Sequence, residues 1–194
     1  MESNSTFFLV ISDSHGDIAN LEAILEWAQS SVCDFTFDAA IFLGDGYADL
    51  AQASARTGFP LSWHAVRGNV DYQQTIHTTK ELDVPAKNPA KKTSRRLFLS
   101  HGNHYRVEEG CQILAAIALS ARAEAALFGH LHVPHCANMD GIFLLNPGSI
   151  SRPRSNAGCT FAVLECPDSG PLAARFFNLE NQQCREITLG VREG

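Results

Sequence analysis

The chain has 194 residues, with 15 Lys and Arg against 21 Asp and Glu, and a formal net charge of −6. Hydrophobic residues make up 45% and charged residues 19%, which excludes a disordered chain and is typical of a globular domain with a sizeable core. The acidic balance argues against a protein that binds nucleic acid through a basic face, but it does not exclude a small anionic substrate held by metal ions.

Apolar runs alternate with helical patterns through the first two thirds of the chain. Between the first two runs, apolar residues recur at helical spacing over residues 18–28, and Asp17 is placed to cap this predicted helix. A second amphipathic pattern predicts a helix over residues 107–121. The apolar runs are bounded by turn-forming or polar residues and predict buried strands at residues 7–11, 39–43, 61–66, 97–99 and 125–128.

The pattern changes after residue 130. Asp140-Gly141 is a two-residue turn signal that predicts a hairpin between strands at residues 135–139 and 142–145. Further strands are predicted at residues 160–164, 173–177 and 186–189. Strand–helix alternation followed by antiparallel strands predicts an α/β fold with a second sheet packed on the first. Because the sequence contains no repeat and no long linker, we expect a single domain over residues 1–194.

The sequence predicts neither a membrane segment nor secretion. The first six residues carry no Lys or Arg, and no stretch approaches the ~18 apolar residues of a membrane span. The six cysteines include no C-x-x-C pair, which predicts reduced thiols packed as small hydrophobic groups. We therefore expect a cytoplasmic protein that does not bind membranes.

Polar clusters follow directly after five of the predicted strands. Residues two apart in an extended segment project to the same side, and α/β folds gather ligand-binding residues at the carboxyl ends of their strands. Neighbouring glycines let the backbone and a metal ion approach closely. The five clusters are Asp13-Ser14-His15, Gly44-Asp45-Gly46, Gly68-Asn69-Val70-Asp71, His101-Gly102 and Gly129-His130-Leu131-His132.

Seven side chains in these clusters can bind a metal ion, namely two Asp, one Asn and four His. Oxygen and imidazole ligands without thiolate suit a catalytic Mn, Fe, Zn or Ni site better than a structural zinc site. Seven ligands exceed what one ion can use while it leaves positions for water and substrate, whereas two ions that share a carboxylate would use them all. Two cations about 3.5–4 Å apart bind the attacking and leaving oxygens of a phosphoryl displacement, so the clusters predict a two-metal hydrolase.

The motifs D-x-H, GD, GN, HG and GH-x-H, in this order, resemble those of the calcineurin-like metallophosphoesterase superfamily. Residues 13–17, 44–46 and 146–149 look like those of its small single-domain bacterial and archaeal phosphodiesterase branch. The resemblance covers about residues 7–165. It implies a four-layer α/β/β/α sandwich of two mixed β-sheets, the metallo-dependent phosphatase-like fold.

Carried over residue by residue, the family pattern implies two metal sites bridged by Asp45. The first ion would be bound by Asp13, His15 and His132, and the second by Asn69, His101 and His130. The implied cofactors are two divalent metal ions, with Mn preferred and Fe, Zn or Ni as alternatives. The implied reaction is in-line attack on phosphorus by a metal-bound hydroxide, with Asp45 and Asn69 as catalytic residues.

One position departs from the pattern of the superfamily's phosphatases. There the residue after the GN asparagine is a histidine thought to assist the leaving group, whereas here it is Val70, which has no proton to donate. The phosphodiesterase branch also lacks that histidine, so the departure fits the branch but leaves the general acid unassigned. His104, three residues after His101, is the nearest candidate for this catalytic role, and a histidine at the surface or behind the ligands is the alternative.

Several residues near the motifs admit two interpretations. Asp71 either orients Asn69 or shapes its turn. Arg152 and Arg154 could each bind a phosphate bidentately, although a surface role is the preferred interpretation. Asn146-Pro147-Gly148-Ser149 is expected to support the ligand loops rather than touch substrate. A basic segment is expected to be a solvated hairpin, with a phosphate-attracting rim as the alternative, and comprises Lys87, Lys91, Lys92, Arg95 and Arg96.

These observations together predict a metal-dependent phosphodiesterase that hydrolyses small phosphodiesters. The enzymatic alternatives are a phosphomonoesterase or a nuclease of the same superfamily. A non-catalytic protein-binding scaffold is the alternative from another class, because a eukaryotic relative of this branch is a scaffold subunit of a membrane-trafficking coat. A scaffold does not need seven intact ligands, so their presence favours the enzyme. The resemblance leaves a homodimer open, and no nucleic-acid partner is expected.

Overall fold

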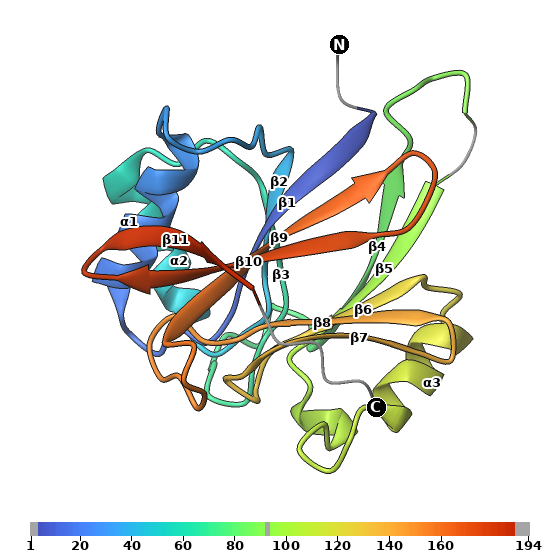
Figure 1. Cartoon of the computed structure of the whole chain (residues 1–194). Coiled ribbons are helices and arrows are strands. Elements are labelled where there is room, and N and C mark those ends of the chain that lie inside the picture. Colours follow the sequence, from blue (N-terminus) through green and yellow to red (C-terminus); the bar gives the residue numbers. More distant parts are fainter. Residues whose placement is uncertain (1–3, 92–93, 189–194) are drawn as a thin grey trace.

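The computed structural model describes residues 4–91 and 94–188, and its strands form two mixed sheets that pack on one another (Figure 1). The larger sheet contains β1 (Ser5–Ile11), β2 (Ala39–Phe42), β3 (Trp63–Ala65), β9 (Cys159–Pro167), β10 (Ala173–Glu180) and β11 (Gln183–Ile187). Their spatial order is β11-β10-β9-β1-β2-β3. The three N-terminal strands are parallel, and β9, β10 and β11 extend the sheet in antiparallel fashion.

The smaller sheet repeats this mixture of parallel and antiparallel strands. It contains β4 (Thr79–Pro85), β5 (Ser94–Ser100), β6 (Ala125–Phe128), β7 (Pro134–Met139) and β8 (Ile142–Pro147), in the spatial order β4-β5-β6-β8-β7. The central strands β5, β6 and β8 are parallel, and β4 and β7 are antiparallel edge strands. The predicted hairpin around Asp140-Gly141 is confirmed as the β7–β8 connection.

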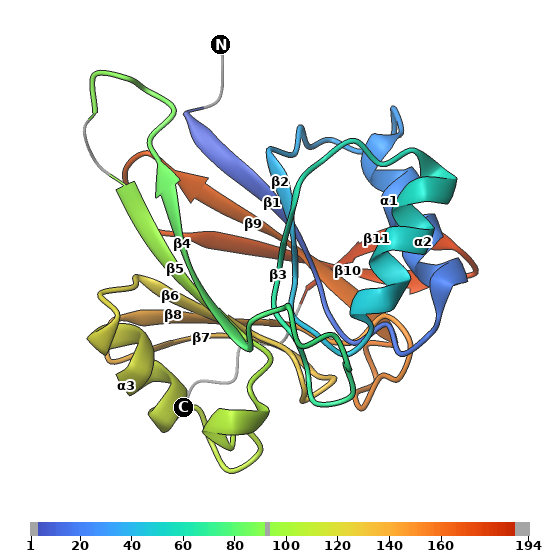
Figure 2. The ribbon, with the colours of Figure 1, turned by 180° about the vertical axis from the view of Figure 1, so that it is seen from behind.

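Helices cover the outer face of each sheet, so that the molecule has four layers. Figure 2 shows α1 (Ile18–Gln29) and α2 (Tyr47–Thr57) on the side of the larger sheet and α3 (Gln112–Ser120) on the side of the smaller one. The packing of strand β1 explains why its sequence is continuously apolar. Phe8 and Val10 join the core between the sheets, whereas Leu9 and Ile11 join the core beneath α1 and α2. The predicted α/β/β/α sandwich is thus confirmed.

Helix α2 and strand β4 were not predicted because their apolar pattern is weak. Helix α2 buries Asp49, Leu50 and Ala53, of which only the leucine is a large apolar residue. Strand β4 is an edge strand in which only Val84 is fully buried. Both elements are stabilised by their neighbours rather than by a strong pattern of their own, because α2 packs against α1 and β4 pairs with β5.

Other predicted boundaries shift. The predicted helix over residues 107–121 begins only at Gln112, because Gly110 has a φ of 134°, which no helical residue adopts. The last strand, predicted at residues 186–189, is β11 at Gln183–Ile187, and Leu189 lies outside the described residues. Helix α1 begins as predicted, with the Asp17 side chain accepting a hydrogen bond from the Asn20 amide at 3.1 Å.

The cysteines and helices agree with two further expectations. All six cysteines are free thiols, and burial raises the pKa of Cys166 to about 12, which makes it a poor metal ligand and a poor nucleophile. Within the described ranges, none of the helices combines the length and the apolar character needed to cross a membrane.

Candidate metal centre

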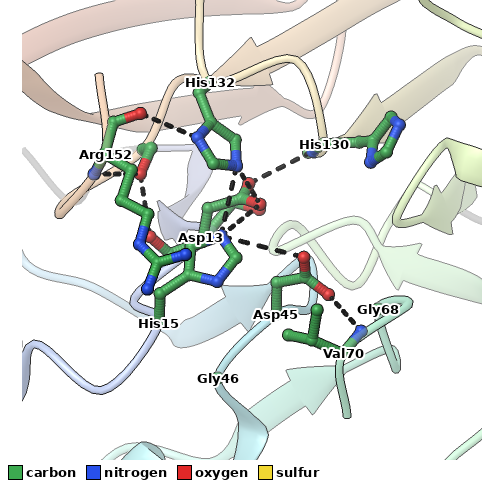
Figure 3. A network of polar contacts seen from close by, with 12 residues as sticks. Asp13, His15, Asp45, Gly46, Gly68, Val70, His130, His132 and Arg152 are labelled. Carbon is green, nitrogen blue, oxygen red and sulfur yellow. Dashed lines mark hydrogen bonds and ion pairs between the residues drawn. The ribbon is translucent and has the colours of Figure 1, made fainter. Parts of the chain in front are cut away.

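The five polar clusters meet at one end of the sandwich, where β1, β2, β3, β5 and β6 end. Figure 3 labels residues of the clusters at 13–15, 44–46, 68–71 and 129–132. Backbone hydrogen bonds connect loops from different strands. The amide of Asp13 donates to the carbonyl of Gly44 at 3.0 Å, and the amide of Gly129 donates to the carbonyl of His101 at 3.0 Å. Parallel strands within each sheet bring their carboxyl ends to the same edge, and the packing of the two sheets brings those edges together.

Five of the seven predicted ligands have a left-handed backbone. The φ angles are 58° at Asp13, 44° at His15, 60° at Asp45, 68° at His130 and 58° at His132. Residues with a Cβ rarely adopt this conformation, which costs roughly 1–2 kcal/mol at each position. Such a backbone persists only where the surrounding structure imposes it, and its concentration at these positions marks a functional site.

Asp13, His15 and His132 place three ligand atoms around one point. The Nε2 atoms of His15 and His132 are 3.2 Å apart, and Asp13 Oδ1 lies 3.0 Å from the latter and 3.7 Å from the former. His132 Nδ1 donates to the carbonyl of Arg152 at 2.7 Å, so Nε2 of the neutral ring carries a lone pair. This lone pair faces the charged Asp13 Oδ1 at 3.0 Å, and a cation between the two atoms would remove their repulsion.

Asp45, Asn69 and His101 form a second set beside the first. His101 Nε2 lies 3.1 Å from Asn69 Oδ1 and 3.4 Å from Asp45 Oδ2. Because His101 Nδ1 donates to the carbonyl of Leu43 at 2.8 Å, the Nε2 atom of the neutral ring has no proton for either oxygen. Asp45 Oδ2 also lies 3.8 Å from Nε2 of His15. Asp45 therefore lies between the two sets, where the sequence predicts a bridging ligand.

His130 is placed differently from the other predicted ligands. Its backbone amide donates to Asp13 Oδ2 at 3.2 Å, whereas its ring points away from Asp13 and Asp45 (Figure 3). The ring packs edge-on against His101 with centroids 5.2 Å apart, and its Nε2 lies 3.7 Å from Glu108 Oε2. The structure thus brings the His130 backbone to the centre, and its imidazole to the wall beside His101.

The carboxylates and imidazoles perturb one another's protonation. Burial by itself would raise the pKa of Asp13, but His132 and His15 hold that pKa well below its usual range. Burial likewise opposes the charge of Asp45 and of His101, yet their mutual attraction lowers the pKa of the carboxyl and raises that of the imidazole. Asp13 Oδ1 is buried without a hydrogen-bond donor. An ionised carboxylate oxygen that is buried and accepts no hydrogen bond needs a positive charge beside it, which a divalent cation would supply.

Asp45 is fixed by the loop that carries Asn69. The amide of Val70 donates to Asp45 Oδ1 at 3.0 Å. A Cβ at Gly68 would come within 2.1 Å of the same oxygen, so only glycine allows the two loops to approach this closely. The orientation of the Asp45 carboxylate therefore depends on the backbone of residues 68–70.

Asp71 holds this arrangement from behind. Its carboxylate accepts hydrogen bonds at 2.8–2.9 Å from the backbone amides of Asp45, Gly46, Tyr47 and Gly68. In the part of the chain that the structure describes, all of its hydrogen bonds go to backbone amides. Of the two interpretations from the sequence, the structure therefore selects the one in which Asp71 shapes the turn.

Replacing Asp71 with alanine is expected to lower the free energy of unfolding by at least about 3 kcal/mol, since each hydrogen bond to a charged acceptor contributes about 1.5–3 kcal/mol. Metal affinity should also fall by about 10–100-fold, because the turn that Asp71 shapes carries Asn69 and holds the backbone of Asp45. Urea denaturation and metal titration measure the two effects. Asp168→Ala is the matched control, because Asp168 accepts backbone hydrogen bonds from Lys87 and Asn88 far from the site. Unchanged metal affinity in the Asp71 variant would contradict this role.

The segment of residues 146–149 supports the ligand loops, as the sequence predicts. The side-chain amide of Asn146 donates to the carbonyl of Gly129 at 2.7 Å, and Ser149 Oγ donates to the carbonyl of Asp13 at 2.8 Å. Both acceptors belong to loops that carry predicted ligands. Asn146 and Ser149 are fully buried, so these bonds are shielded from water.

Two supporting residues were missed by the sequence analysis. Ser12 Oγ donates to Asp13 Oδ2 at 2.5 Å. Asp49 is buried and accepts hydrogen bonds from Ser14 Oγ at 2.5 Å and from the Gly16 amide at 2.9 Å. Asp49 could have been found as an acidic residue in the first turn of a helix that follows Gly-Asp-Gly. It was missed because helix α2 itself was not predicted.

An open cleft of about 450 Å³ leads to the ligands. Its lining consists of His15, Asp45, Asn69, Val70, His130, His132, Arg152, Pro153 and Arg154. The side chain of Val70 is 42% exposed, so the place of the missing histidine presents an aliphatic group to the cleft. Arg152 and Arg154 are exposed, as the preferred interpretation predicts, and both also line the cleft, where a phosphate could reach them.

His104 is an exposed residue of a short 3-10 turn, Asn103–Tyr105, and it is not among the residues that line this cleft. His101, the predicted ligand three residues before it, is buried. The turn therefore directs the two histidines into different environments. A role for His104 as general acid stays a prediction that requires a kinetic test.

The basic segment is remote from the metal centre. Ser94, where β5 begins, and Ser100, where it ends, are about 20 Å apart at the rise of an extended strand. Lys87 pairs with Asp38 and Arg95 with Glu124, while Arg96 pairs with Asp83; Lys92 lies outside the described residues. The described part of the segment fits the solvated hairpin and gives no support to a phosphate-attracting rim or a nuclease surface.

Comparison with known proteins identifies the family of this fold and site. The sequence model of the calcineurin-like phosphoesterase superfamily domain matches residues 7–169. The phosphodiesterase YfcE of Escherichia coli K12 is 28% identical over 172 residues, which cover 79% of this chain and 84% of YfcE. The Bacillus subtilis protein named "Probable metallophosphoesterase YsnB" is 24% identical over 179 residues, 92% of this chain and 95% of YsnB.

Solved structures show the same fold. A predicted phosphoesterase from Streptococcus pneumoniae superposes with a TM-score of 0.67 at 26% identity, covering 94% of this chain and 97% of that one. Vps29 from Entamoeba histolytica, complexed with Zn²⁺, superposes with a TM-score of 0.71 at 21% identity over 94% of this chain and 98% of Vps29. The matched family domain contains all five ligand clusters described above, and the chain therefore belongs to the calcineurin-like phosphoesterase superfamily.

Proposed function

We propose that this protein is a metal-dependent phosphodiesterase that hydrolyses small phosphodiesters with two divalent metal ions, preferably Mn²⁺. The observation that carries the proposal is the pair of ligand sets at the end of an open cleft, with Asp45 between them. Membership of the phosphoesterase superfamily and the similarity to YfcE, a phosphodiesterase, support it.

The ligand assignment follows the two sets. Asp13, His15 and His132 would hold the first ion, Asn69, His101 and His130 the second, and Asp45 both. For His130 this requires a rotation of the imidazole from its place beside Glu108. When bound, divalent ions make water available as a nucleophile near neutral pH and neutralise charge that develops on the phosphoryl oxygens.

The chain's own residues determine how the substrate meets these ions. Asp13 and Asp45 are buried, and their two negative charges favour the binding of cations, which burial alone would disfavour. The amide of Val70 orients the Asp45 carboxylate, while the valine side chain presents no proton to the leaving group. The guanidinium groups of Arg152 and Arg154 add positive charge along one wall of the cleft. This distribution suits an anionic ester with a leaving group that departs without a proton from residue 70.

A non-catalytic scaffold is the second candidate, because Vps29 structures share this fold. The Vps29 likeness, at 21% identity, concerns the fold alone. Since a Vps29 structure contains Zn²⁺, metal binding by this chain does not distinguish the two candidates, whereas hydrolysis does. The retention of acidic, amide and imidazole groups at all seven positions favours the enzyme.

The deciding experiment is an activity panel. Metal-free protein is reconstituted with Mn²⁺, Fe²⁺, Zn²⁺ or Ni²⁺ and assayed on an aryl phosphodiester, an aryl phosphomonoester and a cyclic nucleotide. The expected result is metal-dependent hydrolysis of the diester that exceeds hydrolysis of the monoester. The Asp13→Asn variant, prepared in parallel, controls for contaminating phosphatases. Hydrolysis by no metal form, or equal hydrolysis by the variant, would overturn the proposed function.

Removal of metal is expected to destabilise the fold. A ligand that binds only the native state at 100 times its Kd stabilises it by about 2.7 kcal/mol. Adding Mn²⁺ to chelated protein should therefore raise the Tm measured by differential scanning calorimetry by several degrees. His132→Ala should show a smaller rise, because one of the two sets loses a ligand. A Tm that does not depend on metal concentration would contradict a metal centre in the native state.

A further inference from the structure

Most of the arginines that the structure describes are paired with carboxylates. Among the described residues, six such pairs are Arg56 with Glu22, Arg95 with Glu124, Arg96 with Asp83, Arg106 with Glu109, Arg175 with Glu186 and Arg185 with Glu180. Arg67, Arg122, Arg152 and Arg154 have no guanidinium hydrogen bond or ion pair within the described ranges, and of these four only Arg152 and Arg154 line the metal cleft. Their binding capacity is therefore available to a ligand in that cleft.

The backbone of these two arginines is attached to the metal centre. The carbonyl of Arg152 accepts from His132 Nδ1 at 2.7 Å, and the amide of Arg154 donates to the carbonyl of His132 at 3.0 Å. The amide of Arg152 donates to Ser149 Oγ at 2.9 Å. Pro153 between them restricts the backbone further. The side chains thus start from positions that are fixed relative to a predicted metal ligand.

The Arg152 side chain lies beside the predicted metal ligands. Figure 3 shows the Arg152 side chain extending next to His15, on the side of the centre away from the His130 ring. Guanidinium groups bind phosphate with two parallel hydrogen bonds, which makes a pair of them in one cleft a specific phosphate site. The wall they form is therefore suited to an anion next to the group that the metal ions bind.

The charges indicate that this anion is a second one. Two divalent ions and the guanidinium groups of Arg152 and Arg154 would bring six positive charges. The carboxylates of Asp13, Asp45, Asp49 and Asp71 bring four negative charges, which leaves an excess of two positive charges. A simple phosphodiester brings only one negative charge. A phosphodiester that also carries a terminal phosphate brings about three, enough to compensate the whole excess.

We propose that Arg152 and Arg154 bind a further phosphate group of the substrate, an inference that rests on the proposed function. The preferred phosphodiesters therefore carry a terminal phosphate close to the scissile one. Arg152 binds on the His15 side of the centre, and Arg154 binds farther along the same loop. The two residues thereby determine specificity and do not take part in the transfer of protons.

A matched pair of substrates tests this proposal. The p-nitrophenyl ester of thymidine 5′-phosphate and the same ester with an additional 3′-phosphate release the same leaving group and differ by one phosphate. With Mn²⁺-loaded protein, the kcat/KM ratio should favour the 3′-phosphorylated ester at least about tenfold, the effect of one hydrogen bond to a charged group. The ratio should approach one in Arg152→Ala/Arg154→Ala. The control Arg56→Ala/Arg185→Ala removes the same charge on other elements and should keep the ratio.

A binding measurement gives a second readout. Calorimetric titration should show that wild type binds thymidine 3′,5′-bisphosphate more tightly than thymidine 5′-monophosphate, and that the Arg152→Ala/Arg154→Ala variant does not. Hydrolysis of both esters with a ratio near one, or a preference that survives in this variant, would overturn the inference while leaving the phosphodiesterase in place. If wild type hydrolyses neither ester, the proposed function fails instead, and the titration alone then decides whether the arginines bind the additional phosphate.

Discussion

Asp45→Asn is expected to remove most of the bound metal and to lower the kcat/KM for aryl phosphodiesters by at least about 10²–10³-fold, the loss that follows removal of one preorganised charged or polar group. The carboxylate of Asp45 lies 3.4 Å from His101 Nε2 and 3.8 Å from His15 Nε2, so one substitution affects both ligand sets. An asparagine amide keeps the shape of this side chain but loses its charge and one of its two acceptor oxygens. Elemental analysis of protein dialysed from saturating Mn²⁺ measures the metal content directly.

Two variants show whether the effect is specific. His132→Ala should mainly empty the first site and leave about one ion per chain, because His132 belongs to one set only. Asp38→Asn changes the charge identically at a residue that pairs with Lys87, and it should retain the full metal content. Wild-type protein that binds a single ion at saturation would show that the two-metal proposal is wrong.

The second large effect concerns the leaving group. Since Val70 offers no proton, the rate should depend steeply on the pKa of the departing alcohol, and aryl diesters should react much faster than alkyl monoesters. A positioned general acid is worth about 10²–10⁴-fold, and its help falls mostly on poor leaving groups. A series of aryl esters that differ in phenol pKa gives the slope from kcat/KM.

Variants at two positions locate any proton donor. Val70→His should increase the hydrolysis of poor leaving groups, because residue 70 is 42% exposed at the cleft, and Val70→Leu is the aliphatic control. His104→Ala should have little effect on the slope, given that His104 is exposed and absent from the cleft lining. A selective loss on poor leaving groups in His104→Ala would assign the general acid to His104. A flat dependence in wild type, with chemistry rate-limiting, would reveal a donor elsewhere.

Strongly apolar segments of the fold could be predicted from the sequence. Strand β1 is covered on both faces, so every residue from Phe8 to Ile11 is apolar and its pattern is unambiguous. Helix α2 and strand β4 could not be predicted in the same way, since tertiary packing of small or half-buried side chains stabilises them. Turn chemistry was reliable where a short signal was sufficient, as at Asp17 and at Asp140-Gly141.

For the site, the sequence predicted which residues gather but not where their side chains point. Sequence order and spacing indicated which residues gather, because each cluster directly follows a strand and parallel strands end at one edge. Spacing cannot give side-chain direction, so the turn of the His130 ring toward Glu108 and the aim of Arg152 into the cleft were not predictable. Nor could it show that the Asp71 carboxylate collects four amides, three of them from residues more than twenty positions away.

The left-handed backbone at five ligand positions also constrains protein engineering. Glycine adopts positive φ without steric cost, so Asp13→Gly or Asp45→Gly would relieve backbone strain while deleting a metal ligand. A library selected only for heat resistance, and in the absence of metal, should therefore tolerate glycine at these positions and lose turnover as it gains robustness. Selections that combine heating with a turnover screen should instead draw their improvements from the helices and the outer strands, where no ligand depends on the backbone.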